Sequence, residues 1–167
     1  MAFSLCVSTY SPITPGNHVL KYADDMYLIV PSNNTSSIPN ELAHLATWAT
    51  SNNLQLNPSK CSELIIKKPR THISDPPVLP ELPRVTTLKV LGVTLQSNLL
   101  MTTHVNNIVT KAGQETYALK LVKSHGPPIK LLDMVTHASL LSSMTYASPA
   151  WIGFTSSEDL SRLQAPI

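Results

Sequence analysis

The chain has 167 residues, a formal net charge of +2, 43% hydrophobic residues and only 13% charged residues. This composition supplies enough apolar side chains for a buried core and argues against a disordered chain, and the length fits one domain or a domain with a smaller appendage. The net charge is too small to establish a nucleic-acid partner by itself. The two cysteines, Cys6 and Cys61, lack zinc-ligand spacing, so we expect free thiols in a reducing compartment.

The sequence also bears on location. No stretch reaches the ~18 apolar residues that a transmembrane helix needs. The apolar start, residues 1–10, is short and lacks the positive charges of a secretory signal. We therefore expect no membrane partner and an intracellular protein, in the nucleus or the cytoplasm, that is not secreted. The oligomeric state is left open.

Two adjacent aspartates, Asp24 and Asp25, lie between two runs rich in β-branched, aromatic and aliphatic residues. Residues 19–22 and 26–30 are predicted to be strands joined by a tight turn. Neighbours inside a strand point to opposite faces, but at the tip of a hairpin both carboxylates can face one point. Because Mg²⁺ prefers carboxylate oxygens, the pair is a candidate metal site. The alternative is a solvated turn, where Asp is common.

A helix is predicted after the hairpin. Apolar residues recur at helical spacing over residues 38–49. Ser36 or Ser37 can cap this helix, and Glu41 lies near the positive end of its dipole. Asn52 and the asparagine after it provide a plausible end. We expect this amphipathic helix to lie across one face of a sheet.

Further strands are predicted at residues 62–67, 85–88 and 90–95. Between the first two, a proline-rich stretch at 68–83 is predicted to be an irregular surface loop. Gly92 lies inside the last apolar run, which indicates a bulge or a close backbone approach.

From Thr102 the apolar period becomes helical, and this helix is predicted to end before the Gly-Pro-Pro sequence at 126–128. A second helix is predicted from Ile129 to about residue 143, a break at Pro149, and a last short helix at 156–164. The predicted fold is α+β: an antiparallel sheet with a packed helix over residues 1–95, followed by an α-helical unit over residues 96–167.

Several of these stretches, taken in order, match one family. Tyr22-Ala23-Asp24-Asp25 looks like a Tyr-x-Asp-Asp catalytic hairpin. Residues 54–66, with Lys60 after an Asn-Pro turn, are similar to the next block of that family. Residues 88–95 look like a primer-grip hairpin, and residues 104–112 like the start of a thumb. The chain therefore resembles the reverse transcriptases of non-LTR (LINE-type) retrotransposons over residues 2–152, with the palm in the first unit and the thumb in the second.

The resemblance implies an RNA-directed DNA polymerase, which uses two divalent ions, Mg²⁺ or Mn²⁺, in nucleotidyl transfer. Its partners would be an RNA template, a DNA primer and dNTP. Asp24 and Asp25 would supply catalytic, metal-binding carboxylates, and Tyr22 would lie beside the primer end. Lys60 would be a catalytic residue that approaches the triphosphate; its alternative is a solvated turn residue.

The same resemblance assigns nucleic-acid contacts in the second unit. Leu91 and Gly92 would contact the primer backbone, and Lys111, Lys120 and Lys123 would contact phosphates. The alternatives are a plain bulge at Gly92 and a solvated helix face for the lysines.

The family's third catalytic carboxylate, its Gly-rich block and its fingers have no counterpart in this sequence. We therefore expect a fragment, the C-terminal part of a palm plus a thumb, without polymerase activity of its own. The alternative function is a non-catalytic remnant that binds nucleic acid or a protein. An unrelated phosphotransferase fits poorly, because the five glycines do not form a phosphate-binding cluster.

Overall fold

The computed structural model describes residues 9–67, 74–80 and 82–164. The chain is a mixed α and β protein, and it divides into two compact units, Met1–Cys61 and Ser62–Ile167. The α+β class is confirmed, whereas the palm and thumb identities and the boundary predicted at residue 95 stay predictions. Within the described ranges, no helix is both long and apolar enough to cross a bilayer.

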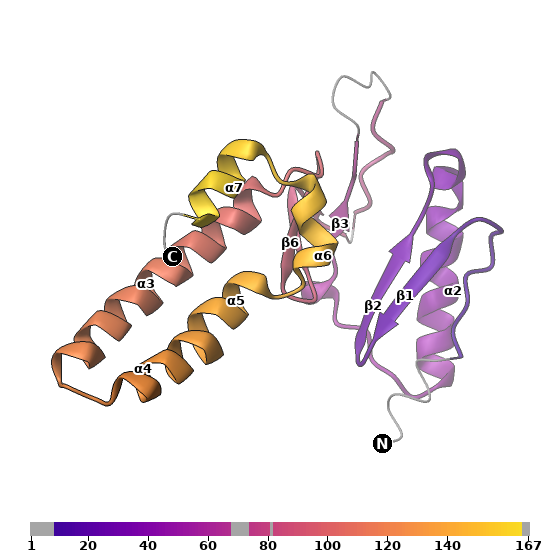
Figure 1. Cartoon of the computed structure of the whole chain (residues 1–167). Helices are drawn as coiled ribbons and strands as arrows, with labels where there is room; N and C mark the ends of the chain where they lie inside the picture. Colours follow the sequence, from indigo (N-terminus) through magenta and orange to yellow (C-terminus); the bar gives the residue numbers. More distant parts are fainter. Residues whose placement is uncertain (1–8, 68–73, 81, 165–167) are drawn as a thin grey trace. The chain divides into compact units, whose positions relative to one another are not determined.

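The first unit contains an antiparallel hairpin and a helix (Figure 1). The hairpin consists of β1 (His18–Tyr22) and β2 (Asp25–Ile29), and it confirms the predicted pair of strands. The hairpin is followed by a 3-10 helix, η1 (Ser32–Ser37). It leads directly into α2 (Ile38–Ser51), which matches the predicted helix.

The two faces of the hairpin differ in exposure. Val19 pairs with Leu28 and Lys21 with Met26, and these four side chains are half-buried. The Lys21 ammonium donates a hydrogen bond to the backbone carbonyl of Tyr10. Burial lowers the pKa of this lysine. The half-buried face of the hairpin therefore lies toward Tyr10, which is only 3% exposed. Tyr10 in turn connects the hairpin to α2.

Aromatic contacts join the approach loop to α2. The Tyr10 ring centroid lies 5.3 Å from those of His44 and Trp48. Trp48 is half-buried, and its indole Nε1 donates to the hydroxyl of Thr9 at 3.3 Å. These contacts pack the side of α2 that carries His44 and Trp48 against Tyr10.

Glu41 has a larger role than the dipole contact expected for it. Its side chain is fully buried, and its carboxylate accepts hydrogen bonds from the backbone N–H groups of Thr14 at 2.8 Å and Ile13 at 3.2 Å and from the Asn17 amide at 2.9 Å. Burial by itself would raise the pKa of Glu41, but these hydrogen bonds lower it overall. Glu41 thus fixes the loop that leads into β1.

The ends of α2 were predicted in part. Ser37 occupies the N-cap position, but its hydroxyl donates to the Asn34 carbonyl and makes no capping hydrogen bond. The expected serine cap is therefore wrong. The expected end is confirmed, because Asn52 is the C-cap residue.

The strands of the second unit are short. The predicted strand at 62–67 is reduced to β3 (Glu63–Leu64), which pairs in parallel with β4 (Arg84–Val85). A second hairpin follows, made of β5 (Thr87–Val90) and β6 (Val93–Gln96). Of the predicted loop at 68–83, the described residues 74–80 are irregular, and the others either border β4 or lie outside the described residues.

The helices of the second unit follow the predicted order (Figure 1). The first is α3 (Thr102–Ser124), which ends before Gly126 as expected. The next helix runs as α4 (Ile129–Val135), a π-helical segment η3 (Thr136–Leu141) and α5 (Ser142–Thr145). It lies antiparallel to α3.

The end of the unit corrects one prediction. The break falls at Tyr146 and Ala147, the latter with a left-handed φ of 50°, rather than at Pro149. Pro149 instead lies in the first turn of α6 (Ser148–Trp151), where its missing N–H costs nothing. A short 3-10 turn, η4 (Ile152–Phe154), and α7 (Ser157–Gln164) are the last elements of the described residues.

The core of the second unit lies between the β5–β6 hairpin, α3 and the helices after it. Trp151 is 2% exposed, and its indole Nε1 donates to the Tyr146 carbonyl at 3.0 Å. Asp159 of α7 is buried and accepts a hydrogen bond from the Thr102 hydroxyl at 2.9 Å. The buried apolar side chains are Val93, Met101, Val105, Ile108, Ala112, Leu140, Met144 and Trp151.

Candidate functional site

The two aspartates lie at the tip of the first hairpin. Tyr22 pairs with Asp25 at the end of the ladder, so Ala23 and Asp24 form a two-residue turn and Asp25 is the first residue of β2. Ala23 has a φ of 52°, a left-handed conformation that costs a non-glycine residue about 1–2 kcal/mol. Both carboxylates are exposed. The sequence prediction of adjacent carboxylates at a tight turn is confirmed.

The surroundings of these two carboxylates bear on whether they could hold a cation. Among the described residues, neither Asp24 nor Asp25 takes part in an ion pair, and Asp25 accepts one hydrogen bond, from the Tyr27 hydroxyl at 3.3 Å. The described ranges also contain no group of three or more acidic, histidine or cysteine side chains placed to hold a metal ion. The tip therefore offers oxygen ligands of the kind that Mg²⁺ prefers, but only two carboxylates.

An apolar face extends from the aspartates along the strands. Directly opposite residues of an antiparallel pair share a face, so Tyr22 lies beside Asp25, and Leu20 beside Tyr27. Tyr22 is 64% exposed and Leu20 57% exposed. Tyr22, chosen from the sequence for the primer end, is thus accessible, and the alternation of residues in β1 could have predicted this face.

Lys60 lies in the same unit, and no ion pair joins it to either aspartate. It ends a 3-10 turn, η2 (Pro58–Lys60), in which the Asn57 side chain accepts the Ser59 N–H at 3.1 Å. Lys60 is exposed, and in the part of the chain described no hydrogen bond or ion pair joins it to another side chain. Its predicted catalytic role stays a prediction, beside the alternative of a solvated turn residue.

Leu91 and Gly92 form the two-residue turn of the second hairpin. Their φ values of 46° and 89° are both positive, as in a type I′ turn. Gly92 is therefore a turn residue and not the bulge in a strand that its sequence position predicted. The Tyr146 hydroxyl donates to the Leu91 carbonyl at 3.2 Å, and a Cβ on Gly92 would lie 3.0 Å from Tyr146 Cε1. The Tyr146 side chain therefore approaches Gly92 closely, and contact of Leu91 and Gly92 with a primer backbone stays a prediction.

The three lysines of α3 do not form one surface. Nine residues separate Lys111 from Lys120, about two and a half helical turns, so these side chains lie on opposite sides of α3. Lys120 and Lys123 are close neighbours three residues apart. All three are exposed, but only Lys111 borders a cleft. The predicted phosphate contacts of the three lysines stay a prediction, beside the alternative of a solvated helix face.

A cleft with a volume of about 610 Å³ lies beside Lys111 in the second unit. It lies between the β5–β6 hairpin, α3 and the π-helical and α5 segments. The sequence analysis did not predict it, although serines recur at helical spacing in the otherwise apolar helix that forms one side. Its lining includes Lys89, Gly92, Thr94, His104, Asn107, Lys111, Glu115, Ser139, Ser142, Ser143 and Tyr146.

His104 forms part of the floor of this cleft. Its Nδ1 accepts the Thr94 backbone N–H at 3.3 Å, and its ring meets Trp151 edge to face with centroids 5.1 Å apart. Burial lowers its pKa. His104 is therefore neutral at pH 7 and adds no positive charge to the cleft.

Comparison with protein-family models, with curated proteins and with solved structures gave no match.

Proposed function

We propose that this chain belongs to an RNA-directed DNA polymerase of the non-LTR retrotransposon type, and that its first hairpin carries two carboxylates of a nucleotidyl-transfer site. The observation that supports the proposal is the hairpin tip: Asp24 and Asp25 are adjacent, exposed and free of protein cations in the described residues. They sit on a turn that places Ala23 in a left-handed conformation, and such strain is concentrated at functional sites.

The ligand atoms at the hairpin tip are carboxylate oxygens, which suit a hard divalent cation, but they come from only two residues. Asp24 and Asp25 would hold Mg²⁺ or Mn²⁺, which in such sites activates an attacking hydroxyl and neutralises charge on a leaving pyrophosphate. A third carboxylate is not grouped with them in the described residues. The proposed enzyme therefore needs a further carboxylate to complete its site, and we expect no DNA synthesis from this chain alone.

The other roles follow the resemblance. Tyr22 would lie beside the end of a DNA primer, and Lys60 would attract the triphosphate of an incoming dNTP. Leu91 and Gly92 would contact the primer backbone, and Lys111, with the other exposed lysines of α3, would contact phosphates of the primer and the RNA template. These contacts are electrostatic and independent of base sequence.

The test measures binding of a fluorescent dNTP with and without Mg²⁺. We expect Mg²⁺ to increase the affinity of the native chain, and Asp24→Asn or Asp25→Asn to remove that increase. Asp133→Asn, on an exposed residue of α4, is the matched control and should behave as the native chain. An identical Mg²⁺ response in all four proteins would refute the proposal.

A non-catalytic nucleic-acid-binding role is the second candidate, and the cleft of the second unit favours it. The two candidates separate in the dNTP assay. A chain that binds nucleic acid but shows no Mg²⁺ response at Asp24 and Asp25 would be a binding protein only. A primer-extension assay that gave Mg²⁺-dependent product from the chain alone, lost in Asp24→Ala, would show that the two-carboxylate site is already complete.

A further inference from the structure

The cleft of the second unit has two chemically different sides. One side carries cationic and amide hydrogen-bond donors, from Lys89 on β5 and from Asn107 and Lys111 on α3. Lys89 has no ion-pair partner in the described ranges, whereas Lys111 lies 3.6 Å from the Glu115 carboxylate and keeps 62% of its side chain exposed. With one carboxylate against two ammonium groups, this side attracts an anion.

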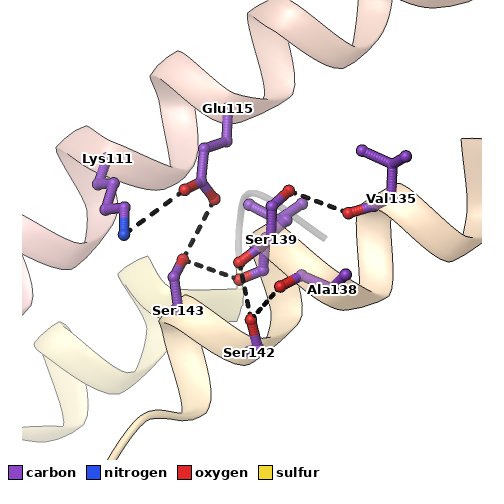
Figure 2. A network of polar contacts seen from close by, with 8 residues as sticks. Lys111, Glu115, Val135, Ala138, Ser139, Ser142 and Ser143 are labelled. Atoms are coloured by element: carbon purple, nitrogen blue, oxygen red, sulfur yellow. Dashed lines mark hydrogen bonds and ion pairs between the residues drawn. The ribbon is translucent and has the colours of Figure 1, made fainter.

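The opposite side carries hydroxyl groups whose protons are already used (Figure 2). Ser139 donates to the Val135 carbonyl at 3.0 Å, and Ser142 donates to the Ala138 carbonyl at 2.5 Å. Because a serine hydroxyl has a single proton and two lone pairs, these two oxygens can only accept a further hydrogen bond. This side of the cleft therefore selects a ligand with hydrogen-bond donors.

Ser139 lies in a π-helical segment, and Ser142 follows it directly in α5. The segment Thr136–Leu141 is π-helical, and such turns are rare and frequently found at functional sites. Ser143, on the same side, is held 3.2 Å from Glu115, and Glu115 also pairs with Lys111. The network in Figure 2 thus fixes the donor side and the acceptor side relative to each other.

Tyr146 adds an aromatic surface at the edge of the cleft. Its hydroxyl is anchored on the Leu91 carbonyl and its ring covers Gly92, yet the residue remains 56% exposed. An aromatic ring held in this way can stack on an unpaired base.

We propose that this cleft binds single-stranded RNA in preference to DNA. Backbone phosphates would bind Lys89 and Lys111, a ribose 2′-hydroxyl would donate to Ser139 or Ser142, and a base would stack on Tyr146. The 2′-hydroxyl is the group by which a protein distinguishes RNA from DNA, and the acceptor side of the cleft supplies its partner. The inference rests on the proposed function and names the strand that the second unit holds.

The experiment measures fluorescence anisotropy of the full chain with a labelled single-stranded RNA, the DNA of the same sequence and the 2′-O-methyl RNA. We expect the RNA to bind about tenfold more tightly than the DNA, the gain from one or two hydrogen bonds of typical strength. The 2′-O-methyl RNA, which has lost the donor proton, should bind like the DNA. This comparison leaves the protein unchanged, so it does not depend on the folding of any variant.

Variants then locate the site. Ser142→Ala should weaken RNA binding severalfold and leave DNA binding unchanged. Lys89→Ala should weaken both and reduce the salt dependence by about 0.7 in log–log slope, the value for one phosphate contact on a single strand. Lys130→Ala, an exposed lysine outside the cleft, is the control and should match the native chain.

Three results would overturn the inference: equal affinity for RNA and DNA, tight binding of the 2′-O-methyl RNA, or native affinity in both Lys89→Ala and Ser142→Ala. Equal affinity for RNA and DNA that Lys89→Ala weakens would remove the RNA preference but leave nucleic-acid binding intact. Failure of the Mg²⁺ response at Asp24 and Asp25, in contrast, would remove the proposed enzymatic function without affecting this cleft.

Discussion

Glu41→Ala tests whether one buried carboxylate holds the first unit together. Glu41 is fully buried in α2, and its partners lie 24 to 28 residues earlier in the chain, in the loop that enters β1. Removing the carboxylate leaves the N–H groups of Ile13 and Thr14 without their acceptor, and the Asn17 amide keeps only the Ser37 hydroxyl as acceptor. The loop then loses its main attachment to α2, and the hairpin with Asp24 and Asp25 is affected through it.

The magnitude follows from these contacts. Three donors lie within 3.2 Å of the carboxylate, and a hydrogen bond to a charged group contributes about 1.5–3 kcal/mol. Desolvation of the carboxylate and rehydration of the partly exposed loop N–H groups offset part of this sum. We expect Glu41→Ala to destabilise the unit by about 3 kcal/mol, and Glu41→Gln, which retains one acceptor oxygen but turns amide protons toward the donors, by about 2 kcal/mol.

The assay is amide hydrogen exchange at α2, read at buried Ala49, because exchange reports the opening of each unit separately. Asn40→Ala, a neighbouring exposed position, is the control and should change the opening free energy by less than about 0.5 kcal/mol. The expected 3 kcal/mol corresponds to roughly a hundredfold faster opening.

The same carboxylate predicts a pH dependence. Its pKa is lowered in the folded state from an ordinary value of 4.5. The contribution of Glu41 to stability is therefore fully present above pH 4.5 and is lost as the pH falls through the folded pKa. Carbon-13 NMR of the Glu41 carboxyl should give a pKa below 4.5. A value of 4.5 or above, or an opening free energy in Glu41→Ala within 0.5 kcal/mol of the native value, would refute the reasoning.

Two further predictions concern the second unit, and urea unfolding followed by Trp151 fluorescence measures both. Gly92→Ala places a methyl group at φ +89° and 3.0 Å from Tyr146, and we expect the free energy of unfolding to fall by about 2 kcal/mol. Gly153→Ala, with no atom within 4 Å of the new Cβ, is the control. Equal effects of the two substitutions would contradict the turn assignment. Asp159→Ala removes the acceptor of the Thr102 hydroxyl and should cost about 2–3 kcal/mol. The control is Glu158→Ala, at the exposed acid next to it, which should cost less than about 0.5 kcal/mol. Similar losses in the two variants would show that the buried carboxylate contributes little.

Local signals predicted the elements that position the candidate site. Two runs of β-branched and aromatic residues around Asp24 and Asp25 were sufficient for the first hairpin, because its turn has only two residues and its strands are adjacent in the chain. Helical periodicity likewise predicted α2 and α3. In each case the information lies within one turn or one strand of the residue concerned.

Features that depend on distant partners were missed. The predicted strand at 62–67 is only two residues long, because its parallel partner β4 offers only Arg84 and Val85. Glu41 was expected near a helix dipole, since nothing in its neighbourhood shows that a loop about 25 residues away would bury it. The lack of ion pairs to Asp24 and Asp25 among the described residues could not be predicted either, because it depends on which lysines fold back toward them.

One side of the cleft left a signal in the sequence. Ser139, Ser142 and Ser143 recur at helical spacing and indicate a polar stripe in an apolar helix. The π-helical segment and the pairing of Lys111 with Glu115 decide that this stripe faces α3, and neither is visible in the residue pattern. Tyr146 gave no signal, because its contact with Gly92 joins residues 54 positions apart.

The central claim is that Asp24 and Asp25 bind a divalent cation, and titration of the chain with Mn²⁺ under two-dimensional NMR tests it most directly. We predict that the amide signals of residues 22–25 broaden first, with dissociation on the order of 1 mM as for other weak carboxylate sites, and that the double variant Asp24→Asn/Asp25→Asn loses this broadening. Broadening that begins elsewhere, or that persists in the double variant, would contradict the account.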